Sequence, residues 1–499
     1  MLVFVAPVVD FNFINWNHVE MLFVLNKFFL FENVEFLYIR NVFLHKKNTI
    51  KLNEHMRNLS ITGVILLYLA LSGCGKGDGR GELVGVTTKT VKQELPYGMV
   101  YIPAGTFIMG QVDQDVTISQ FPQNKQVTIS AFYMDETEIS NSEYKQFVNW
   151  VRDSIAYNLV GKPQKFTLKS KGGKGTPYIN WKAMNSGKGI WGDKTLKDKL
   201  DQAMYYSGSN KFFNKKELKV EQLKYDYAWV DYKKAANYRA LRDPNLTKGA
   251  PTVERDQFIV KEETYIYPDT LVWISDFTYA QNDPMAKGYF SHPSFANYPV
   301  VGVTWEQAKA FTVWRSRLNE SYKTSKNLPT RLDYDLPTEA EFEYAARGGR
   351  VATSYPWGGP YIRNAKGCLL ANFKPGRGNY IDDGGAFTVY VKSYFPNDYG
   401  LYNMAGNVAE WTSSIYNDAA SAYVSTINPS FNKAVQKGDP DYNKKRVVKG
   451  GSWKDIGYFL QNSAKSYEYP DSARSSIGFR CVTPFLGRDI KDKPGKMKP

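Results

Sequence analysis

Two short segments near the C-terminal end constrain this chain most: Gly450-Gly451-Ser452-Trp453 and, further along, Ile477-Gly478-Phe479-Arg480-Cys481. Adjacent glycines adopt backbone conformations that other residues avoid, so the first segment predicts a tight turn that ends at Ser452. Ser452 is therefore expected to be a residue of an irregular turn and not of a regular helix.

The cysteine and histidine content limits the chemistry that this chain can perform. It has three cysteines and four histidines, and His292 is the only histidine downstream of residue 73. This excludes a zinc or iron cluster rich in histidine, and any Ser/His/Asp triad would depend on His292 alone. We therefore expect a structural role for His292, with a catalytic one as the alternative.

The first folded segments predict strands and a helix. Residues 99–110 predict a strand, a Pro-Ala-Gly turn and a second strand, which together form a hairpin. A strand in 132–135 is expected to lead into a helix capped by Ser140 or Asn141. The apolar spacing places these side chains on the buried face of that helix: Tyr144, Phe147, Val148 and Val151.

Two further helices have clear start signals. An extended strand in 298–303 is expected to lead into a helix capped by Thr304, with Ala308, Phe311 and Trp314 buried. Thr338 with Glu341 matches a capping box, and Gly348 suits the end of that helix.

The N-terminal part resembles an export signal. Met56-Arg57 precedes an apolar run from Ile61 to Leu71, which is too short for a comfortable transmembrane helix. The run ends at Leu71-Ser72-Gly73-Cys74, which resembles a bacterial lipobox. We expect a signal peptide at 56–73, lipidation of Cys74 and a glycine-rich tether at 74–98. The alternative is a signal peptide that contains a cysteine by chance.

Residues 1–55 are rich in apolar and aromatic side chains and would place the signal peptide inside the chain. We interpret them as an upstream extension from a misassigned start, with Met56 as the initiator. An additional membrane anchor is the alternative.

The chain is basic. Residues 74–499 keep 58 Lys/Arg against 44 Asp/Glu, a formal charge of +14. This excess suits nucleic acid, acidic lipid or an acidic protein partner. Export and the lack of a nucleic-acid-binding motif argue against nucleic acid.

Together with motifs upstream, the two C-terminal segments resemble the formylglycine-generating-enzyme (sulfatase-modifying factor) superfamily. The motifs follow the family's order across residues 99–481: 99–110, 132–141, 298–305, 336–349, 355–358, 400–411 and 450–481. The resemblance implies an α+β, irregular, C-type-lectin-like fold over 99–485.

Active members of this family carry two cysteines, three and eight residues past the serine of the Gly-Gly-Ser turn, for copper-dependent oxidation. Asp455 and Leu460 stand there in this chain. A carboxylate and an alkyl group cannot act as thiolate nucleophiles or soft metal ligands. The resemblance therefore implies a non-catalytic member without a catalytic cofactor, in which Ser452 is a remnant of the substrate pocket.

Residues 152–292 form a family-specific insertion rich in lysine and tyrosine, in which 267–292 predict ordered strand and turn. With the lipobox and the basic tail at 486–499, the insertion resembles type IX secretion and gliding-motility lipoproteins of the PorK/GldK and GldJ types. Chain length and tail favour the PorK/GldK type. The resemblance implies an anchor on the periplasmic face of the outer membrane, a PorN/GldN-type partner and a large ring. Tyrosines and tryptophans would place partner binding on the insertion, and its lysines would add electrostatic steering.

The resemblance also implies two structural calcium sites, because hard cations prefer a mixture of carboxylate, amide and backbone oxygens. The first would use the side chains of Asn372 and Asp383 with the carbonyls of Phe373 and Gly385. The second would use the side chains of Asn403 and Glu410 with the carbonyls of Gly406 and Val408.

Cys481 matches a disulfide-bonded cysteine of the family, whose partner position is Thr312 here. A Cys368–Cys481 bond, two free thiols and a bond to a partner protein all remain open.

The expected function is a scaffold subunit of the type IX secretion machinery. The alternatives are a GldJ-type gliding lipoprotein, a metal-dependent oxidase of the same superfamily, and a protein that binds glycan or peptide in a lectin-like pocket.

Overall fold

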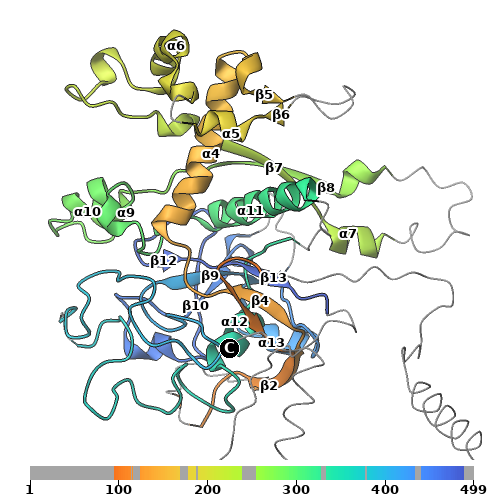
Figure 1. Ribbon diagram of the computed structural model, residues 1–499. Helices are drawn as coiled ribbons and strands as arrows, with labels where there is room; N and C mark the ends of the chain where they lie inside the picture. The colour runs from red at the N-terminus through yellow and green to blue at the C-terminus, as the bar shows by residue number, and fades with distance from the viewer. Residues whose placement is uncertain are drawn as a thin grey trace, which may run out of the picture. The chain divides into compact units, whose positions relative to one another are not determined.

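The computed structural model describes residues 95–113, 115, 124–168, 178–186, 189–238, 254–326, 333–376, 379–432 and 440–487. Figure 1 shows these elements in sequence colours. The predicted upstream extension, signal peptide, Cys74, most of the tether and all but the first two residues of the basic tail lie outside these ranges. Within the described part, no helix is both long and apolar enough to cross a membrane.

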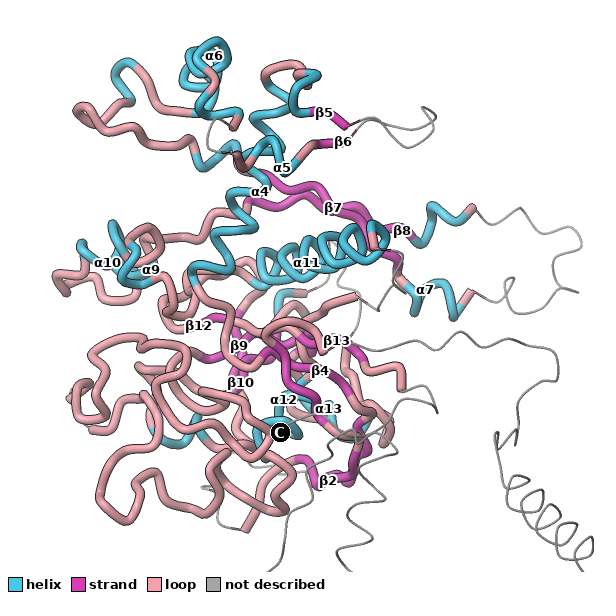
Figure 2. Tube along the Cα trace, in the orientation of Figure 1, coloured by secondary structure: helices cyan, strands magenta, loops and turns pink. Residues whose placement is uncertain are grey.

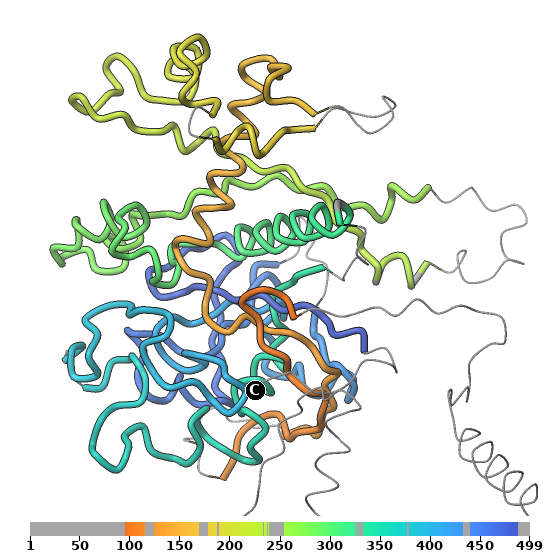
Figure 3. The backbone as a smooth tube through the Cα atoms, in the orientation of Figure 1, coloured from red at the N-terminus to blue at the C-terminus, as the bar shows by residue number. Residues whose placement is uncertain are grey.

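Two small sheets contain parts of four of the motifs, 99–110, 132–141, 400–411 and 450–481. One has the order β1-β4-β13, made of β1 (Met99–Ile102), β4 (Phe132–Asp135) and β13 (Val482–Pro484), all antiparallel. The first and last strands of the described chain thus flank the same strand (Figure 3, orange and dark blue).

The second sheet has the order β11-β10-β9-β12. It contains β9 (Ala409–Ile415), β10 (Arg446–Lys449), β11 (Ser466–Glu468) and β12 (Ile477–Gly478), and β12 runs parallel to β9. All seven residues of β9 are buried, so this strand crosses the interior. Because β10 ends at Lys449, the sheet directly positions the turn at Gly450 and Gly451.

The predicted hairpin over 99–110 is wrong. Both strands are present, but β1 pairs with β4, and β2 (Gly105–Met109) pairs with β3 (Lys125–Ile129). The carbonyl of Pro103 accepts a hydrogen bond from the hydroxyl of Tyr344 at 3.0 Å, and a side chain at position 105 would overlap that hydroxyl. The segment between the strands is therefore fastened to a helix and leads the chain into a second sheet.

The three helices predicted from their capping residues begin where the sequence predicts. The helix α4 (Asn141–Leu159) is capped by Ser140, α11 (Trp305–Ser325) by Thr304 and α12 (Glu339–Arg347) by Thr338, each with a complete capping box. Gly348 ends α12 with φ of 61°. The predicted strand before α11 is reduced to an isolated bridge between Pro299 and Ser140.

The predicted buried faces of α4 and α11 pack against each other. Tyr144 stacks on Phe311 with ring centroids 5.6 Å apart, and Phe147 lies 5.2 Å from Trp314. All four side chains are at most 5% exposed. This aromatic core joins the helices to the second sheet through Phe479, whose ring centroid is 5.4 Å from that of Phe311.

Residues 152–292 contain mostly short elements. They are β5 (Thr167–Leu168), β6 (Tyr178–Ile179), α5 (Trp181–Met184), α6 (Lys194–Met204), β7 (Lys224–Val230), α7 (Tyr232–Asn237), β8 (Ile259–Tyr265), α9 (Val272–Ser275) and α10 (Asp283–Gly288). The longest pairing is the antiparallel ladder between β7 and β8.

The strand expected within 267–292 is absent: α9 and α10 occupy the segment. One helical turn lets Val272 and Trp273 both point inward, where Trp273 is 1% exposed. Tertiary packing thus overrides the local preference of this aromatic sequence for a strand. The described residues between α12 and β9 are loop, and the short helix α13 (Ala420–Tyr423) follows β9 (Figure 2).

Candidate functional site

The turn after β10 depends on its two glycines. Gly450 and Gly451 have φ of 90° and 69°, in the left-handed region that other residues rarely adopt. A Cβ at Gly451 would also lie 2.9 Å from the carbonyl carbon of Phe459. The sequence-predicted turn is therefore confirmed, and it delivers a fully buried Ser452 and a 2% exposed Trp453.

Ser452 and Asp455 close the turn on themselves. The Ser452 hydroxyl donates to Asp455 Oδ2 at 2.5 Å, and the Ser452 backbone N–H donates to the same oxygen at 3.0 Å. The backbone N–H of Asp455 donates back to the Ser452 carbonyl at 2.9 Å. Burial raises the pKa of Asp455, although the Ser452 hydrogen bonds and Lys454 oppose the shift. The Ser452 hydroxyl and the Asp455 carboxylate are thus hydrogen-bonded to each other.

Leu460 is part of the hydrophobic core. It ends a 3-10 turn (Gly457–Leu460) and is 1% exposed. It belongs to a buried cluster with Tyr355, Leu369, Ala371, Phe373 and Ala405. An alkyl side chain surrounded by apolar groups supplies neither a metal ligand nor a nucleophile at this position.

Trp453 is covered by the region 152–292. Its ring stacks on Trp273 of α9 at 6.0 Å and packs against Phe277 at 5.5 Å. Its indole N–H donates to the carbonyl of Ser475 at 3.1 Å, and Ser475 in turn donates its hydroxyl to Asp276 at 2.6 Å. Aromatic side chains of the region 152–292 therefore cover Trp453, the residue that directly follows Ser452.

The first predicted calcium site brings Asn372 and Asp383 to the same loop cluster. Asn372 Oδ1 is buried without a hydrogen-bond partner. The Asp383 carboxylate accepts the backbone N–H of Phe373 at 2.6 Å and of Gly385 at 3.0 Å, and burial raises its pKa. An amide oxygen without a hydrogen-bond partner, together with a nearby carboxylate, fits a hard cation. Phe373 and Gly385 were predicted to contribute their carbonyls, but they contact Asp383 through their backbone N–H groups.

The second predicted site does not fit calcium. Both oxygens of Glu410 accept hydrogen bonds from Arg480, at 2.6 and 2.7 Å, and both side chains are fully buried. The guanidinium neutralises the carboxylate and would repel a cation. Only Asn403 Oδ1, which is buried without a partner, remains available among the predicted side chains.

Sequence reasoning missed Glu138, which lies beside this pair. Its carboxylate accepts from Asn403 Nδ2 at 3.2 Å and from Asn407 Nδ2 at 3.0 Å, and the residue is fully buried. Burial raises its pKa to about 8, against the opposing effect of Arg480 and with a further increase from Glu410. A glutamate between motif residues gives no local sign of burial, so only its three-dimensional partners identify it.

A cavity of about 540 Å³ lies next to the turn. Its wall is formed by α12, the end of β9 and residues on both sides of Leu460, among them Glu339, Glu343, Tyr416, Phe459 and Lys465. Among the described lining residues there is no cysteine and no histidine. The strongest nucleophiles and most common metal ligands are thus missing from this wall.

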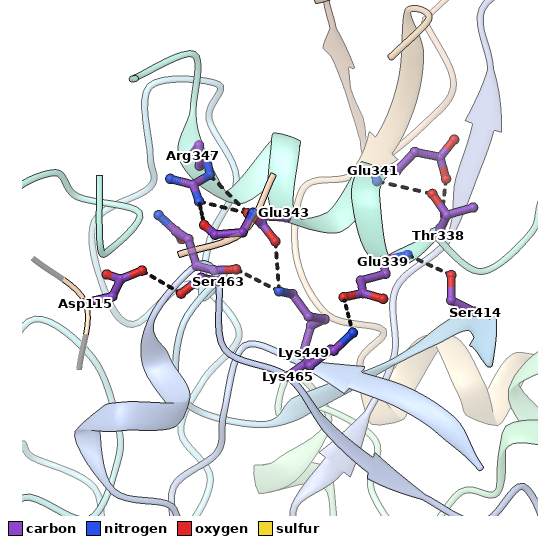
Figure 4. Close-up of polar contacts among 12 residues, drawn as sticks. Asp115, Thr338, Glu339, Glu341, Glu343, Arg347, Ser414, Lys449, Ser463 and Lys465 are labelled. Carbon is purple, nitrogen blue, oxygen red and sulfur yellow. Dashed lines mark hydrogen bonds and ion pairs between the residues drawn. The ribbon is translucent and has the colours of Figure 1, made fainter. Parts of the chain in front are cut away.

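Two glutamates of the cavity wall form ion pairs (Figure 4). Glu343, 1% exposed, lies 2.8 Å from Arg347 and 3.2 Å from Lys449. Burial alone would raise the pKa of Glu343, but Lys449 and Arg347 hold it below its ordinary value. Glu339 pairs with Lys465 at 3.1 Å. The charges of Glu339 and Glu343 in the cavity wall are therefore already neutralised.

The two described cysteines are free. Cys368 is exposed and Cys481 is buried, and no bond joins them. Burial, with Asp135 adding to it, raises the pKa of Cys481 well above its ordinary value. Cys481 therefore lacks the thiolate character of a reactive cysteine. Across the described residues, no group of three or more His, Cys, Asp or Glu side chains is placed to hold a metal ion.

Comparison with known proteins gives consistent similarities. The family model of the sulfatase-modifying factor enzyme 1-like domain matches residues 86–484. The formylglycine-generating enzyme of Bos taurus is 30% identical over 397 residues, which cover 78% of this chain and 76% of that protein. Inactive C-alpha-formylglycine-generating enzyme 2 of Bos taurus is 33% identical over 192 residues, or 37% of this chain and 50% of that protein. The structure of PvdO from Pseudomonas aeruginosa aligns with a TM-score of 0.41 and 15% identity, covering 78% of this chain and 94% of that one.

Proposed function

Because this chain belongs to the sulfatase-modifying factor enzyme 1-like family, we propose that it uses the family's domain as a non-catalytic scaffold. In this proposal it is a lipoprotein of the PorK/GldK type on the periplasmic face of the outer membrane. It forms part of a ring in the type IX secretion and gliding-motility machinery, together with a PorN/GldN-type partner.

The closed turn at Ser452 is the observation that supports this proposal most. The oxygen of Asp455 that faces Ser452 is occupied by two hydrogen bonds, and Leu460 is packed among apolar side chains. Oxidation at a pair of thiolates needs soft ligands at both positions. The similarity to a protein named an inactive formylglycine-generating enzyme is compatible with a member that lacks this activity.

A direct assay tests the absence of catalysis. The purified protein is incubated with copper and a cysteine-containing peptide, and aldehyde formation is followed by mass spectrometry, with the Bos taurus enzyme as the positive control. We expect no more aldehyde than copper alone produces from the same peptide. Turnover that disappears in Ser452→Ala or Asp455→Ala, while both variants keep their melting temperature within a few degrees, would instead support the metal-dependent oxidase.

The proposed anchor is tested with Cys74→Ala, with Cys368→Ala as the matched control because Cys368 is an exposed cysteine of the described domain. We expect the first variant to leave the membrane fraction and the second to stay there, since stable anchoring requires acyl chains. Equal membrane retention of both variants would contradict lipidation at Cys74.

The region 152–292 provides the proposed protein-binding surface. Four of its tyrosines are more than half exposed: Tyr178 at 54%, Tyr232 at 73%, Tyr265 at 54% and Tyr279 at 104%. Tyrosine combines a large apolar ring with a hydrogen-bonding hydroxyl, a combination enriched at protein interfaces. These side chains are therefore suitable anchors for a partner.

A pull-down from solubilised membranes tests this surface. We expect the wild-type chain to capture a PorN/GldN-type protein, and the double variant Tyr232→Ser/Tyr279→Ser to capture less. The matched control is Tyr361→Ser, which changes a tyrosine that is 75% exposed outside this region. Capture of a different set of gliding proteins would favour the GldJ type, and equal capture by all three proteins would exclude this surface.

We further propose that a structural calcium ion binds at Asn372 and Asp383 and stiffens the surrounding loops. Calcium at about one hundred times its dissociation constant stabilises the fold by roughly 2.7 kcal/mol. The expected result is a rise in melting temperature with calcium over EDTA that is lost in Asp383→Ala and kept in Asn403→Ala. A rise that survives Asp383→Ala would exclude this site.

A further inference from the structure

The loop that follows α6 is held at its base by hydrogen bonds and projects an exposed segment. Its two arms pair at the base, where the backbone N–H of Tyr206 donates to Glu217 at 3.0 Å and that of Lys219 donates to Met204 at 2.8 Å. Met204 is fully buried, so the base is fixed to the core. The side chain of Lys216 reaches back to Asp201 at 2.5 Å and lies over the ring of Tyr205. All of residues 207–217, which we call the tip, are exposed (Figure 1, next to α6).

Two phenylalanines occupy the outermost turn of the tip. Phe212 is 59% exposed and Phe213 is 81% exposed, with ring centroids 4.7 Å apart. The backbone N–H of Lys215 donates to the Phe212 carbonyl at 3.2 Å and closes the turn. Phe213 has φ of 49°, a left-handed conformation that is unusual for a bulky aromatic residue. Strained residues of this kind are kept mostly where they serve a function.

Positive charge surrounds the two rings. The tip contains Lys211, Lys215 and Lys216 against Glu217, a net charge of +2. Within the described residues neither Lys211 nor Lys215 forms an ion pair, so both ammonium groups are available to an anionic surface. The adjacent α6 carries three lysines against two aspartates, which are Lys194, Lys197 and Lys199 against Asp198 and Asp201, so it adds a smaller positive charge.

The residue types distinguish a lipid surface from a protein surface. Lysine is depleted at protein interfaces, whereas lysine beside phenylalanine is typical of segments that lie in a membrane surface. Phenylalanine also lacks the polar group that makes the exposed tyrosines of the same region suited to a protein partner. A phenylalanine ring can be buried among acyl chains, while the ammonium groups of neighbouring lysines stay at the level of the lipid phosphates.

We propose that the tip inserts Phe212 and Phe213 into an anionic bilayer, with Lys211 and Lys215 on the phosphate groups. The tip is a second, non-covalent membrane contact that works in the absence of acyl chains. It would fix the orientation of the domain against the bilayer, which the proposed attachment at Cys74 alone cannot do.

Co-sedimentation with vesicles tests the proposal. The full chain carrying Cys74→Ala is used throughout, so that no acyl chain contributes, and failure of this test leaves the lipoprotein proposal untouched. Vesicles of phosphatidylcholine alone are compared with vesicles that also contain phosphatidylglycerol. We expect binding to the anionic vesicles that weakens at high salt.

Variants identify the residues. Phe212→Ser/Phe213→Ser should weaken binding by about tenfold or more, and Lys211→Glu/Lys215→Glu should remove the preference for anionic vesicles. The matched control is Phe395→Ser, which changes an 89% exposed phenylalanine outside this loop and should bind like the parent. Equal binding by the tip variants and the parent overturns the proposal.

Phe213→Gly separates binding from folding. Glycine accepts φ of 49° without strain, so this variant should melt at or above the parent's temperature while binding vesicles more weakly. Unchanged vesicle binding in Phe213→Gly contradicts insertion of the ring. Loss of partner capture in the double phenylalanine variant with unchanged vesicle binding would assign the tip to a protein interface, which also overturns the proposal.

Discussion

The turn at Ser452 and the tip at 207–217 differ in whether their side chains have partners inside the protein. At the turn, the hydroxyl, the carboxylate and the nearby ion pairs all have partners inside the protein. At the tip, two aromatic rings and two ammonium groups face solvent on a braced backbone. Groups that interact with another molecule must be left available by their own fold. The difference therefore directs attention from the interior of this domain to its surface.

The largest expected effect on stability comes from removing Arg480, which forms a buried ion pair with Glu410. Arg480→Ala leaves Glu410 buried without its positive partner, and removal of one member of a buried ion pair destabilises by roughly 3–5 kcal/mol. Urea unfolding measures the loss. Arg363→Ala, which removes a half-exposed ion pair with Asp382, is the control and should change stability by less than about 1 kcal/mol.

The core position at Leu460 gives the next largest effect. Leu460→Ala should lower the free energy of unfolding by about 3 kcal/mol, because it creates a cavity among the apolar side chains around it. Leu460→Cys restores part of the volume and should cost less. Equal stability of wild-type protein and Leu460→Ala, measured by urea unfolding, would show that this position is not packed.

Glu138 should make the interior sensitive to pH. Burial raises the pKa of Glu138 from 4.5, the ordinary value of a glutamate, to about 8 in the folded protein, so folding favours the protonated acid. The stabilisation is complete below pH 4.5 and is lost as the pH rises through 8, so the free energy of unfolding should fall across this window. Unfolding in EDTA at pH 5 and pH 8 should show this decline for the wild type. Glu138→Gln cannot titrate, and a decline of the same size in that variant would refute the assignment.

The smallest expected effect on stability is at the tip. Phe212→Ser should change the free energy of unfolding by less than about 0.5 kcal/mol, because the ring is 59% exposed and loses few contacts. The same urea experiment measures it. A loss of 2 kcal/mol or more would mean that the ring supports the fold, and the contrast between the two regions would disappear.

Features encoded by residues close in sequence could be predicted, and those that join distant segments could not. The Thr338–Glu341 capping box and the Gly450–Gly451 turn need only a few neighbouring residues, and both are present. The expected hairpin over 99–110 failed because β1 takes its partners from 132–135 and 482–484. The strand pairings therefore depend on contacts that no local pattern records.

The same distinction applies to the candidate site. Asp455 and Ser452 are three residues apart, and their bond follows the spacing of a small polar turn. Arg480 lies 70 residues from Glu410 and carries no sign of its partner in the sequence. The family resemblance predicted Glu410 as a calcium ligand, but it did not foresee that an arginine would occupy both of its oxygens.

The sheet that holds β4 between β1 and β13 has a consequence for biosynthesis. β1 begins at Met99, whereas β13 ends at Pro484, so a growing polypeptide cannot complete the sheet until nearly all of it has been made. Until then, the edge of β4 that awaits β13 stays open to pairing with other strands. Stalled or truncated products would carry that open edge permanently, which makes them candidates for aggregation and for removal by proteases.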